Sequence, residues 1–288
     1  MAAQSAYYLS NLYLNFAMFL NPDFLSFQTL YAENFYMVNN LEEAKKIYYN
    51  IQNKGRIYKW HSAKQISNIL IKEKKEKEAA EILKKNYEQL IEPSIYETYD
   101  YAEFLKNNEK YNKSLRYYTE IIDMIDENHY LYSKVRDGRG VANERLGNWQ
   151  DAEKDFLNSL RVKPNQPYVI NYLAYSWIEK GLNVEKSLSM LKKANELKKN
   201  DGYIIDSLGW ALFKLKQYKE AKQQLQSAVR IMPSDPVIND HFADSLWMND
   251  QKIQARYYWK YVLKLEKTEK KLKEQIKKKL IFGPNIKL

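Results

Sequence analysis

The sequence contains no cysteine, so disulfide bonds, thiolate zinc sites and cysteine nucleophiles are all excluded. Glycine and proline are also scarce, with 8 and 7 among 288 residues. These numbers are too small for the many tight turns of a β-sandwich or β-barrel, and they suit long helices. The shortage of turn residues therefore predicts an all-α fold.

Long hydrophobic runs and a positively charged N-terminus are absent as well. No run reaches the roughly 18 apolar residues that a transmembrane helix needs. The first basic residue is Lys45, so the positive start of a signal peptide is missing. Since 45% of the residues are hydrophobic and 28% are charged, we expect a folded, soluble protein with ample material for a core.

The net charge of +10 is concentrated at one end of the sequence. Residues 251–288 contain 12 Lys or Arg and 3 Asp or Glu, a net +9, which leaves 34 basic and 33 acidic residues in positions 1–250. Because the body is nearly neutral, the overall charge does not indicate a nucleic-acid ligand, and we do not expect nucleic acid as the main partner.

An internal repeat is the strongest pattern in the sequence. Residues 203–212 read YIIDSLGWAL, and they are followed at fixed offsets by Ala221, Leu225, Ala228 and Pro233. This order of Leu-Gly, a large residue, spaced small residues and a closing proline within about 34 residues is typical of the tetratricopeptide repeat (TPR). The sequence is therefore identified as a member of the TPR family.

The same pattern recurs before and after this unit. Four strong repeats fill residues 133–265, and weaker repeats that keep the phase fill residues 25–128. The small and large residues at corresponding positions are Ala243, Ala255 and Trp259; Ala174, Ser187 and Leu191; Gly140, Ala152 and Phe156; Ala102, Ser114 and Tyr118; Ser67, Ala79 and Leu83; and Ala32, Ala44 and Tyr48. We predict a right-handed TPR superhelix, an α-solenoid of six to seven helix-turn-helix repeats. The segment 127–132 lengthens one interval by about four residues, either as a longer loop or as a boundary.

Both ends depart from the repeat. Residues 1–24 resemble a second helix without its first, which would make the chain the C-terminal part of a longer protein or leave this helix to pack on something else. Residues 266–288 form a basic tail, and Glu266 to Lys279 reads as a final helix with an apolar stripe. We expect it to be the capping helix, with contact to an anionic membrane or to nucleic acid as the alternative.

Small residues at the repeat positions have a packing role. Two helices can approach to about 8–10 Å between axes only where the facing residue is small. Gly209, Ala221 and Ala228 supply such contacts, and Pro233 ends the second helix because it lacks an amide hydrogen. These residues therefore carry structure, and any binding function must use positions that the packing leaves free.

Helical spacing selects those free positions on the inner face of the strong repeats, where the first helices point. The predicted partner-binding residues are aromatic, amide and acidic: Tyr168, Asn171, Tyr175, Tyr203, Asp206, Trp210, Phe213, Asp240, Asp244 and Trp247, with Lys214, Val237 and Met248 beside them. Trp and Tyr often dominate binding energy, and a groove that combines them with Asp suits an extended peptide with apolar and basic or amide groups. The alternative is that the aromatic residues pack between neighbouring repeats.

Catalytic and metal-binding patterns are not found. His61, His129 and His241 fall in separate repeats, without a helical-spacing partner for a metal. The segment 138–140 reads GRG but lacks the Gly-Lys-Ser/Thr of a phosphate loop. We therefore predict no enzyme activity, no metal and no cofactor.

Three segments add a narrower resemblance: NYLAYSW at 171–177, DSLGWAL at 206–212 and DPVINDH at 235–241. They resemble the C-terminal repeats of proteobacterial TPR proteins that are exported or lipid-anchored, over about residues 133–265. Some of those proteins are adaptors that deliver substrates to periplasmic carboxy-terminal processing proteases. The resemblance implies a periplasmic or envelope location, whereas the lack of an export signal implies the cytoplasm if residue 1 is the true start.

Two related TPR-like classes fit less well. Chaperone-binding TPR domains hold a peptide carboxylate with Lys, Asn and Arg, but the matching positions here carry Asn171, Asp206 and Asp240. Pentatricopeptide RNA binders usually line a basic groove and lack the small-residue pattern.

We therefore expect a non-catalytic scaffold or adaptor that binds a protein or peptide on its inner face. The alternative is an architectural subunit of a larger complex. Membrane contact is expected only through the basic C-terminal helix or a missing N-terminal anchor.

Overall fold

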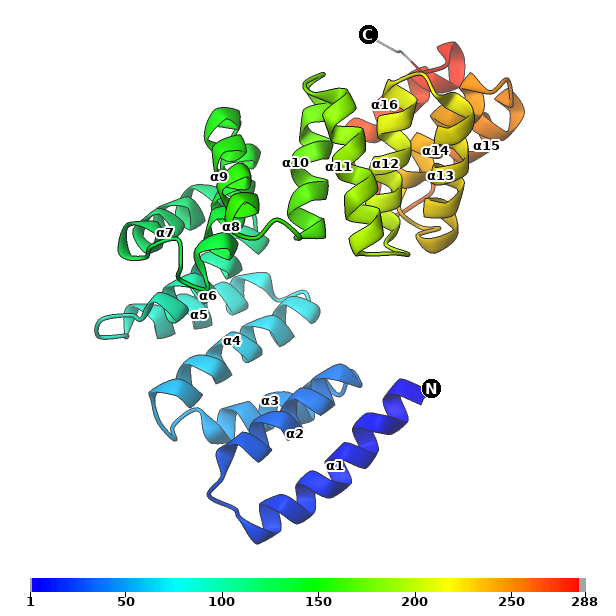
Figure 1. Cartoon of the computed structure of the whole chain (residues 1–288). Coiled ribbons are helices and arrows are strands. Elements are labelled where there is room, and N and C mark those ends of the chain that lie inside the picture. Colours follow the sequence, from blue (N-terminus) through cyan, green and yellow to red (C-terminus); the bar gives the residue numbers. More distant parts are fainter. Residues whose placement is uncertain (1, 285–288) are drawn as a thin grey trace. The chain divides into compact units, whose positions relative to one another are not determined.

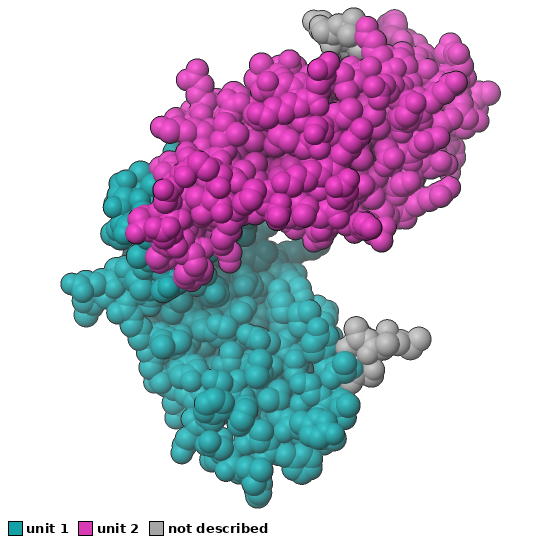
Figure 2. Space-filling view, in the orientation of Figure 1, with its two compact units in different colours: residues 1–125 teal, residues 126–288 magenta. Residues whose placement is uncertain are grey.

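The computed structural model describes the backbone of residues 2–284 and the side chains from residue 6 onward, and this range contains sixteen helices and no strand. The chain divides into two compact units, residues 1–125 and residues 126–288 (Figures 1 and 2). Each unit is described below by itself.

Unit 1 is a row of antiparallel helices in which neighbours along the chain pack together (Figure 1). Its helices are α1 (Ala2–Leu20), α2 (Leu25–Met37), α3 (Leu41–Ile51), α4 (Arg56–Lys72), α5 (Glu76–Glu88), α6 (Ile95–Asn107) and α7 (Tyr111–Met124). Three helical hairpins, α2/α3, α4/α5 and α6/α7, follow the single helix α1, which packs against α2.

Unit 2 repeats the same arrangement. Its helices are α8 (Tyr132–Arg145), α9 (Trp149–Val162), α10 (Pro167–Glu179), α11 (Val184–Leu197), α12 (Gly202–Lys214), α13 (Tyr218–Ile231), α14 (Pro236–Met248), α15 (Lys252–Val262) and α16 (Lys270–Phe282). Four hairpins, α8/α9 to α14/α15, are followed by the single helix α16, which contacts α15. With the three hairpins of unit 1, the described residues form seven, which confirms the predicted all-α TPR solenoid.

The small residues of the repeat do lie at the helix crossings. Ala221, Leu225 and Ala228 have no exposed surface. A Cβ atom on Gly209 would lie 2.6 Å from Cγ of Leu225, so only glycine fits at this crossing. The TPR pattern in this sequence is therefore a packing requirement that the structure fulfils.

Besides Asn183 in the α10/α11 turn, each hairpin turn contains one residue with a left-handed backbone at a shared position. These residues lie two positions after the last residue of each first helix, at Asn39, Lys74, Glu109, Gly147, Gly181, Lys216 and Asp250. The left-handed conformation lets the amide groups after the helix bond back to its last carbonyls. Only two of the seven are glycine, so the sequence analysis did not recognise the turns.

The two single helices have different surfaces. Helix α1 presents Tyr13, Phe16 and Phe19 to solvent, with 66%, 60% and 85% of these side chains exposed. Helix α16 buries Ile276 completely, packs Leu272 and Leu280 beside it, and leaves most of its lysines in water. The predicted final helix is present, but it begins at Lys270 rather than at Glu266, because residues 263–269 form a turn first.

Within residues 2–284, none of the helices combines the length and the apolar character that spanning a membrane requires.

Candidate functional site

Three first helices of unit 2, α10, α12 and α14, carry all ten predicted partner-binding residues. Their N-terminal ends are fixed by local signals: Asp201 accepts hydrogen bonds from the amides of Tyr203 and Ile204, and Asp235 caps α14 in the same way. Pro236 occupies the first turn of α14, where its missing amide hydrogen costs nothing. These caps set the positions from which the site side chains project.

The smaller of two neighbouring cavities lies between the N-terminal halves of α12 and α14 and the part of α10 from Asn171 to Glu179. It has a volume of about 420 Å³, and its lining includes four predicted residues, Asn171, Tyr175, Tyr203 and Asp206. Tyr203 is 53% exposed and the adjoining Val237 is 44% exposed, so both offer apolar surface to a ligand. This cavity is a half-open cleft with aromatic walls.

A polar atom in this cleft lacks an internal partner. Oδ1 of Asn171 is buried, and no hydrogen-bond donor reaches it within the described residues. A buried acceptor that is left unpaired costs about 1–3 kcal/mol. Because Oδ1 itself is buried, Asn171 could accept a hydrogen bond from a bound molecule only after its side-chain amide turns toward the cleft.

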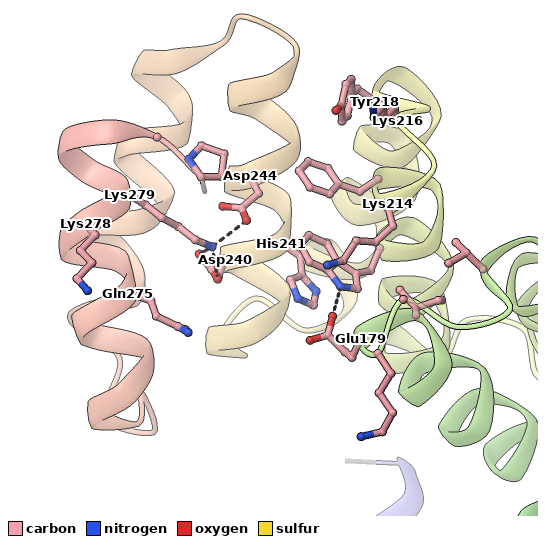
Figure 3. Close-up of a pocket in the computed structure, with 18 of the residues that line it drawn as sticks. Glu179, Lys214, Lys216, Tyr218, Asp240, His241, Asp244, Gln275, Lys278 and Lys279 are labelled. Carbon is pink, nitrogen blue, oxygen red and sulfur yellow. Dashed lines mark hydrogen bonds and ion pairs between the residues drawn. The ribbon is translucent and has the colours of Figure 1, made fainter. Parts of the chain in front are cut away.

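The larger cavity, of about 1170 Å³, lies between the C-terminal halves of α12 and α14 and the helix α16 (Figure 3). Its lining includes four more predicted residues, Trp210, Phe213, Asp240 and Asp244. Glu179 and Lys180 line both cavities, so the two spaces adjoin. Eight of the ten predicted residues therefore surround one continuous region of unit 2.

Helix α16 supplies a cation to the acidic residues of this region. Nζ of Lys279 lies 2.8 Å from Oδ2 of Asp240 and 2.8 Å from Oδ2 of Asp244 (Figure 3). Trp259 donates a further hydrogen bond to Asp244. The two carboxylates are 6% and 3% exposed, so they are interior groups that are paired within the chain.

Burial is the largest single influence on the pKa values of Asp244 and Lys279. It raises the pKa of Asp244 to about 7, and the nearby carboxylate of Asp240 adds to that effect while Lys279 opposes it. For Lys279 burial favours the neutral amine, but the two carboxylates outweigh it and raise its pKa. Lys279 therefore stays charged at neutral pH.

His241 plays the corresponding role for Asp206. Its Nδ1 lies 3.0 Å from Oδ2 of Asp206, and both side chains are buried. Burial disfavours the imidazolium, but the charges of Asp206, Asp240 and Asp244 outweigh it and raise the pKa of His241. The ring also stacks on Trp210, with centroids 4.0 Å apart, and Trp210 stacks in turn on Phe213.

Two predicted residues line neither cavity. Tyr168 is 53% exposed, and its hydroxyl donates a hydrogen bond to Asp201. Trp247 packs against Trp259, with ring centroids 5.4 Å apart, and lies under the guanidinium of Arg256. Both residues have contacts within the chain.

The acidic residues of the inner face are less available to a ligand in the structure than the sequence suggested. The acids at positions 206, 240 and 244 were expected to face a ligand, but each is buried and paired with a basic side chain inside unit 2. Sequence reasoning missed those partners, His241 and Lys279. The repeat period was the available signal for His241, since Asp206 and His241 are 35 residues apart and one repeat is about 34.

No group of three or more His, Asp or Glu side chains in the described part of the chain is arranged to hold a metal ion. His61 lies 3.7 Å from Glu33 in unit 1, and burial lowers its pKa. His129 lines neither cavity.

Comparison with known proteins gives the same fold and a family. A model of the tetratricopeptide repeat matches residues 34–268. The TPR repeat-containing protein PA4667 of Pseudomonas aeruginosa is 24% identical over 172 residues, and protein MJ1428 of Methanocaldococcus jannaschii is 24% identical over 160 residues. The matches cover 59% and 53% of this chain but only 28% and 27% of those proteins, so the chain spans about a quarter of their length.

Two solved structures show the same helical architecture. The APC/C hetero-tetramer Cut9-Hcn1 matches 96% of this chain and 55% of the compared chain, with a TM-score of 0.70 and 15% identity. A tetratricopeptide repeat protein from Parabacteroides merdae matches 77% of this chain and 85% of its own, with a TM-score of 0.58 and 15% identity. Proteins of this kind are generally non-catalytic scaffolds for protein–protein interaction. Because the family model covers most of the sequence, this chain belongs to the tetratricopeptide-repeat family.

Proposed function

We propose that this chain is a non-catalytic adaptor that holds an extended peptide segment of a partner protein on the inner face of unit 2. The observation that carries the proposal is the grouping of eight predicted residues around two adjoining cavities. Protein scaffolds bind through concave surfaces that combine apolar walls with a few polar groups.

The smaller cavity supplies the anchor for such a segment. Tyr203 and Val237 offer exposed apolar surface next to Tyr175, which is half-buried. Exposed aromatic residues in a cleft are the side chains that most often dominate binding energy. A large apolar side chain of the peptide would cover Tyr203 and Val237.

Asn171 supplies the polar contact. Its buried Oδ1 lacks a donor among the described residues. A turn of the side-chain amide toward the cleft would let a backbone amide of an extended peptide donate to this oxygen. Binding would relieve the cost of the unpaired acceptor, and this gain does not depend on the peptide's sequence. The arrangement thus fits recognition of a main chain as well as a side chain.

The experiment is a selection of peptides from a displayed random library on the immobilised chain, followed by fluorescence anisotropy with the selected peptide. Tyr203→Ala should weaken binding at least about tenfold, as expected for a dominant aromatic contact. Asn171→Ala should weaken it about threefold to tenfold through the lost hydrogen bond. Both variants should keep the helical circular dichroism of the parent.

A matched control is Tyr257→Ala, which removes a tyrosine that is 68% exposed on α15 and lines neither cavity. It should bind like the parent. Equal loss of binding in Tyr203→Ala and Tyr257→Ala, or none in either, would rule out this cleft.

Trp210 and Asp240 are poor probes of the proposal because both have internal partners. Trp210 stacks on His241 and donates to Glu179 at 2.6 Å, and Asp240 pairs with Lys279. Their replacement would disturb the fold along with any binding. The exposed side chains of Tyr203 and Val237 separate the two effects.

The second candidate is an architectural subunit that meets an anionic partner through α16. The lysines at positions 270, 271, 277 and 278 are exposed on this helix, and Phe282 is 81% exposed at its end. This role predicts that Lys270→Glu together with Lys271→Glu removes salt-dependent binding to anionic vesicles or to nucleic acid while Tyr203→Ala has no effect. The adaptor role predicts the reverse pattern.

The resemblance to envelope adaptors supplies a first partner class for the adaptor role. We would test purified carboxy-terminal processing proteases as ligands of the parent and of Tyr203→Ala. Binding that depends on Tyr203 would support recruitment of such an enzyme, whereas absence of binding would leave only the general adaptor role.

A further inference from the structure

The large cavity of unit 2 is lined by more cations than anions once α16 is in place. The acidic residues of its lining are Glu179, Asp240 and Asp244. The lysines of its lining are Lys180, Lys214, Lys216, Lys278 and Lys279. The sequence alone indicated an acidic inner face. Without α16 the lining would contain three acidic residues and three lysines, and the two lysines of α16 make it net positive.

The carboxylates of the cavity are mostly withdrawn from a ligand. Asp240 and Asp244 are buried and share the ammonium of Lys279. Only Glu179 remains exposed, and it accepts a hydrogen bond from the indole of Trp210. A molecule that enters the cavity therefore meets little free negative charge.

The lysines, by contrast, are accessible. Lys180, Lys216 and Lys278 are exposed and Lys214 is half-buried. Within residues 6–284, none of these four is joined to a carboxylate by an ion pair. Lys214 lies 5.1 Å from the ring of Trp210 and Lys180 lies 4.9 Å from the ring of Trp149, so their positions are supported by aromatic faces.

The lysines come from separate elements around the cavity. Lys180 follows α10, Lys214 ends α12 and Lys216 follows it, and Lys278 lies on α16 (Figure 3). A single carboxylate could meet only part of this set. Several carboxylates along one chain could meet all of it, and a cavity of about 1170 Å³ has room for a few residues of peptide.

We infer that the large cavity binds an acidic segment of a partner protein, with Asp or Glu side chains paired to Lys180, Lys214, Lys216 and Lys278. This inference rests on the proposed adaptor function and specifies its partner, because the cavity adjoins the Tyr203 cleft at Glu179 and Lys180. The segment would place an apolar residue against Tyr203 and its acidic residues among the lysines. These lysines are not the positions at which chaperone-binding TPR domains hold a carboxylate, since those carry Asn171, Asp206 and Asp240 here.

Three fluorescein-labelled decapeptides with amidated C-termini test the inference. Each contains one Leu and one Phe, and the remaining side chains are Glu and Asp in the first, Gln and Asn in the second, and Lys in the third. We expect the acidic peptide to bind at least about tenfold more tightly than the amide peptide in 50 mM NaCl, and to weaken severalfold in 300 mM NaCl because screening reduces the attraction. The lysine peptide should bind weakest.

The variant Lys214→Glu/Lys216→Glu should lower affinity for the acidic peptide at least about tenfold and leave affinity for the amide peptide nearly unchanged. Its control is Lys219→Glu/Lys260→Glu, which makes the same change in net charge at two exposed lysines outside the cavity. A similar loss in both variants would show that net charge alone governs binding, and would overturn the inference. Unchanged thermal melting of the first variant excludes an effect through unfolding.

Three further binding measurements distinguish an internal acidic segment from other anionic ligands. If the acidic peptide binds only with a free C-terminus, the ligand is a terminal carboxylate and the proposed internal segment is wrong. If a single-stranded oligonucleotide binds more tightly than the acidic peptide and depends on the same lysines, the site takes nucleic acid and the inference is again wrong. If selected peptides depend on Tyr203 but the acidic peptide shows no advantage, the inference fails while the adaptor function stands.

Discussion

Units 1 and 2 are built from the same helical hairpin, yet they place their charged residues differently. In unit 1 the pair of Arg56 and Glu97 is partly open to water, with side-chain exposures of 49% and 10%. In unit 2 Lys279 and its partner Asp244 are 17% and 4% exposed. The repeat pattern fixes the packing of both units, but it leaves the polar positions free, and unit 2 uses them for a buried network beside two cavities.

The single helices show the same contrast. Helix α1 of unit 1 contains no charged residue and exposes aromatic side chains, whereas α16 of unit 2 is rich in lysine and inserts one of them among buried acids. A helix that follows the repeats can therefore decide the charge of the inner face. Four predictions test how far this difference between the units extends.

The largest effect is expected from Lys279→Met. It leaves the carboxylates of Asp240 and Asp244 buried without a cation, and breaking a buried pair in this way costs about 3–5 kcal/mol. The measurement is urea unfolding followed by tryptophan fluorescence. Lys277→Met, at an exposed lysine paired with Glu274, is the matched control and should cost less than about 1 kcal/mol.

A triple variant sharpens this test. Adding Asp240→Asn and Asp244→Asn to Lys279→Met removes the uncompensated charges, so much of the lost stability should return. If the triple variant is less stable than Lys279→Met alone, charge pairing is not the reason that α16 docks here.

The next largest effect on stability is expected at the helix crossing inside a hairpin, a packing arrangement that occurs in each unit. Gly209→Ala places a methyl group 2.6 Å from Cγ of Leu225, and such overpacking should cost about 1–3 kcal/mol. The corresponding residue in unit 1 is Ala102, which has no exposed surface. Ala102→Gly should cost only about 1 kcal/mol by increasing backbone freedom, and thermal denaturation of both variants checks the ranking.

The pH dependence of the units should run in opposite directions. The pKa of Asp244 is raised on folding from 3.8 to about 7, so unit 2 should lose stability by roughly 1.4 kcal/mol per pH unit as pH rises from about 4 toward 7. The raised pKa of His241 should add to this loss above pH 6.5. Pairing with Arg56 lowers the pKa of Glu97 to about 2, so its contribution to unit 1 is present above about 4.5 and is lost as pH falls toward 2.

Hydrogen exchange, corrected for intrinsic rates, can measure both directions by following α14 and α6 separately. Proton NMR gives a direct check, in which His241 should titrate above 6.5 and His61 below it. Asp206→Asn should lower the pKa of His241. A value for His241 below that of His61 would contradict the paired arrangement.

The smallest effect is expected at the hairpin turns. Lys74 in unit 1 and Asp250 in unit 2 have φ of 62° and 59°, a conformation that glycine adopts without strain. Lys74→Gly and Asp250→Gly should therefore each stabilise the protein by about 0.5–1 kcal/mol. Chemical denaturation should show equal gains, and a loss at either site would mean that the side chain contributes to the turn.

The fold was predictable because its determinants are local and periodic. Gly209, Ala221 and Leu225 recur in kind every 34 or so residues, and each helix pair needs small residues where its axes cross. Left-handed turn residues such as Lys74, Glu109 and Lys216 escaped prediction because lysine and glutamate are not types that favour this backbone.

The site was predictable only in outline. Helical spacing found the inner-face positions, but it could not show that Lys279 reaches Asp240 across 39 residues or that His241 meets Asp206 across 35. The first contact depends on how α16 docks, which no repeat position encodes. The charge of the cavity could not be read from the first helices alone for the same reason.

The most direct test of the account is hydrogen–deuterium exchange of the whole chain with and without a library-selected peptide. The adaptor account predicts added protection in α10, α12, α14 and the C-terminal half of α16, the segments that supply most of the lining of the two cavities. It also predicts no added protection in α15, or in α13 beyond its first residue Tyr218, because no other residue of these two helices lines a cavity. Protection confined to α1–α7, or none at all with a peptide that binds, would contradict it.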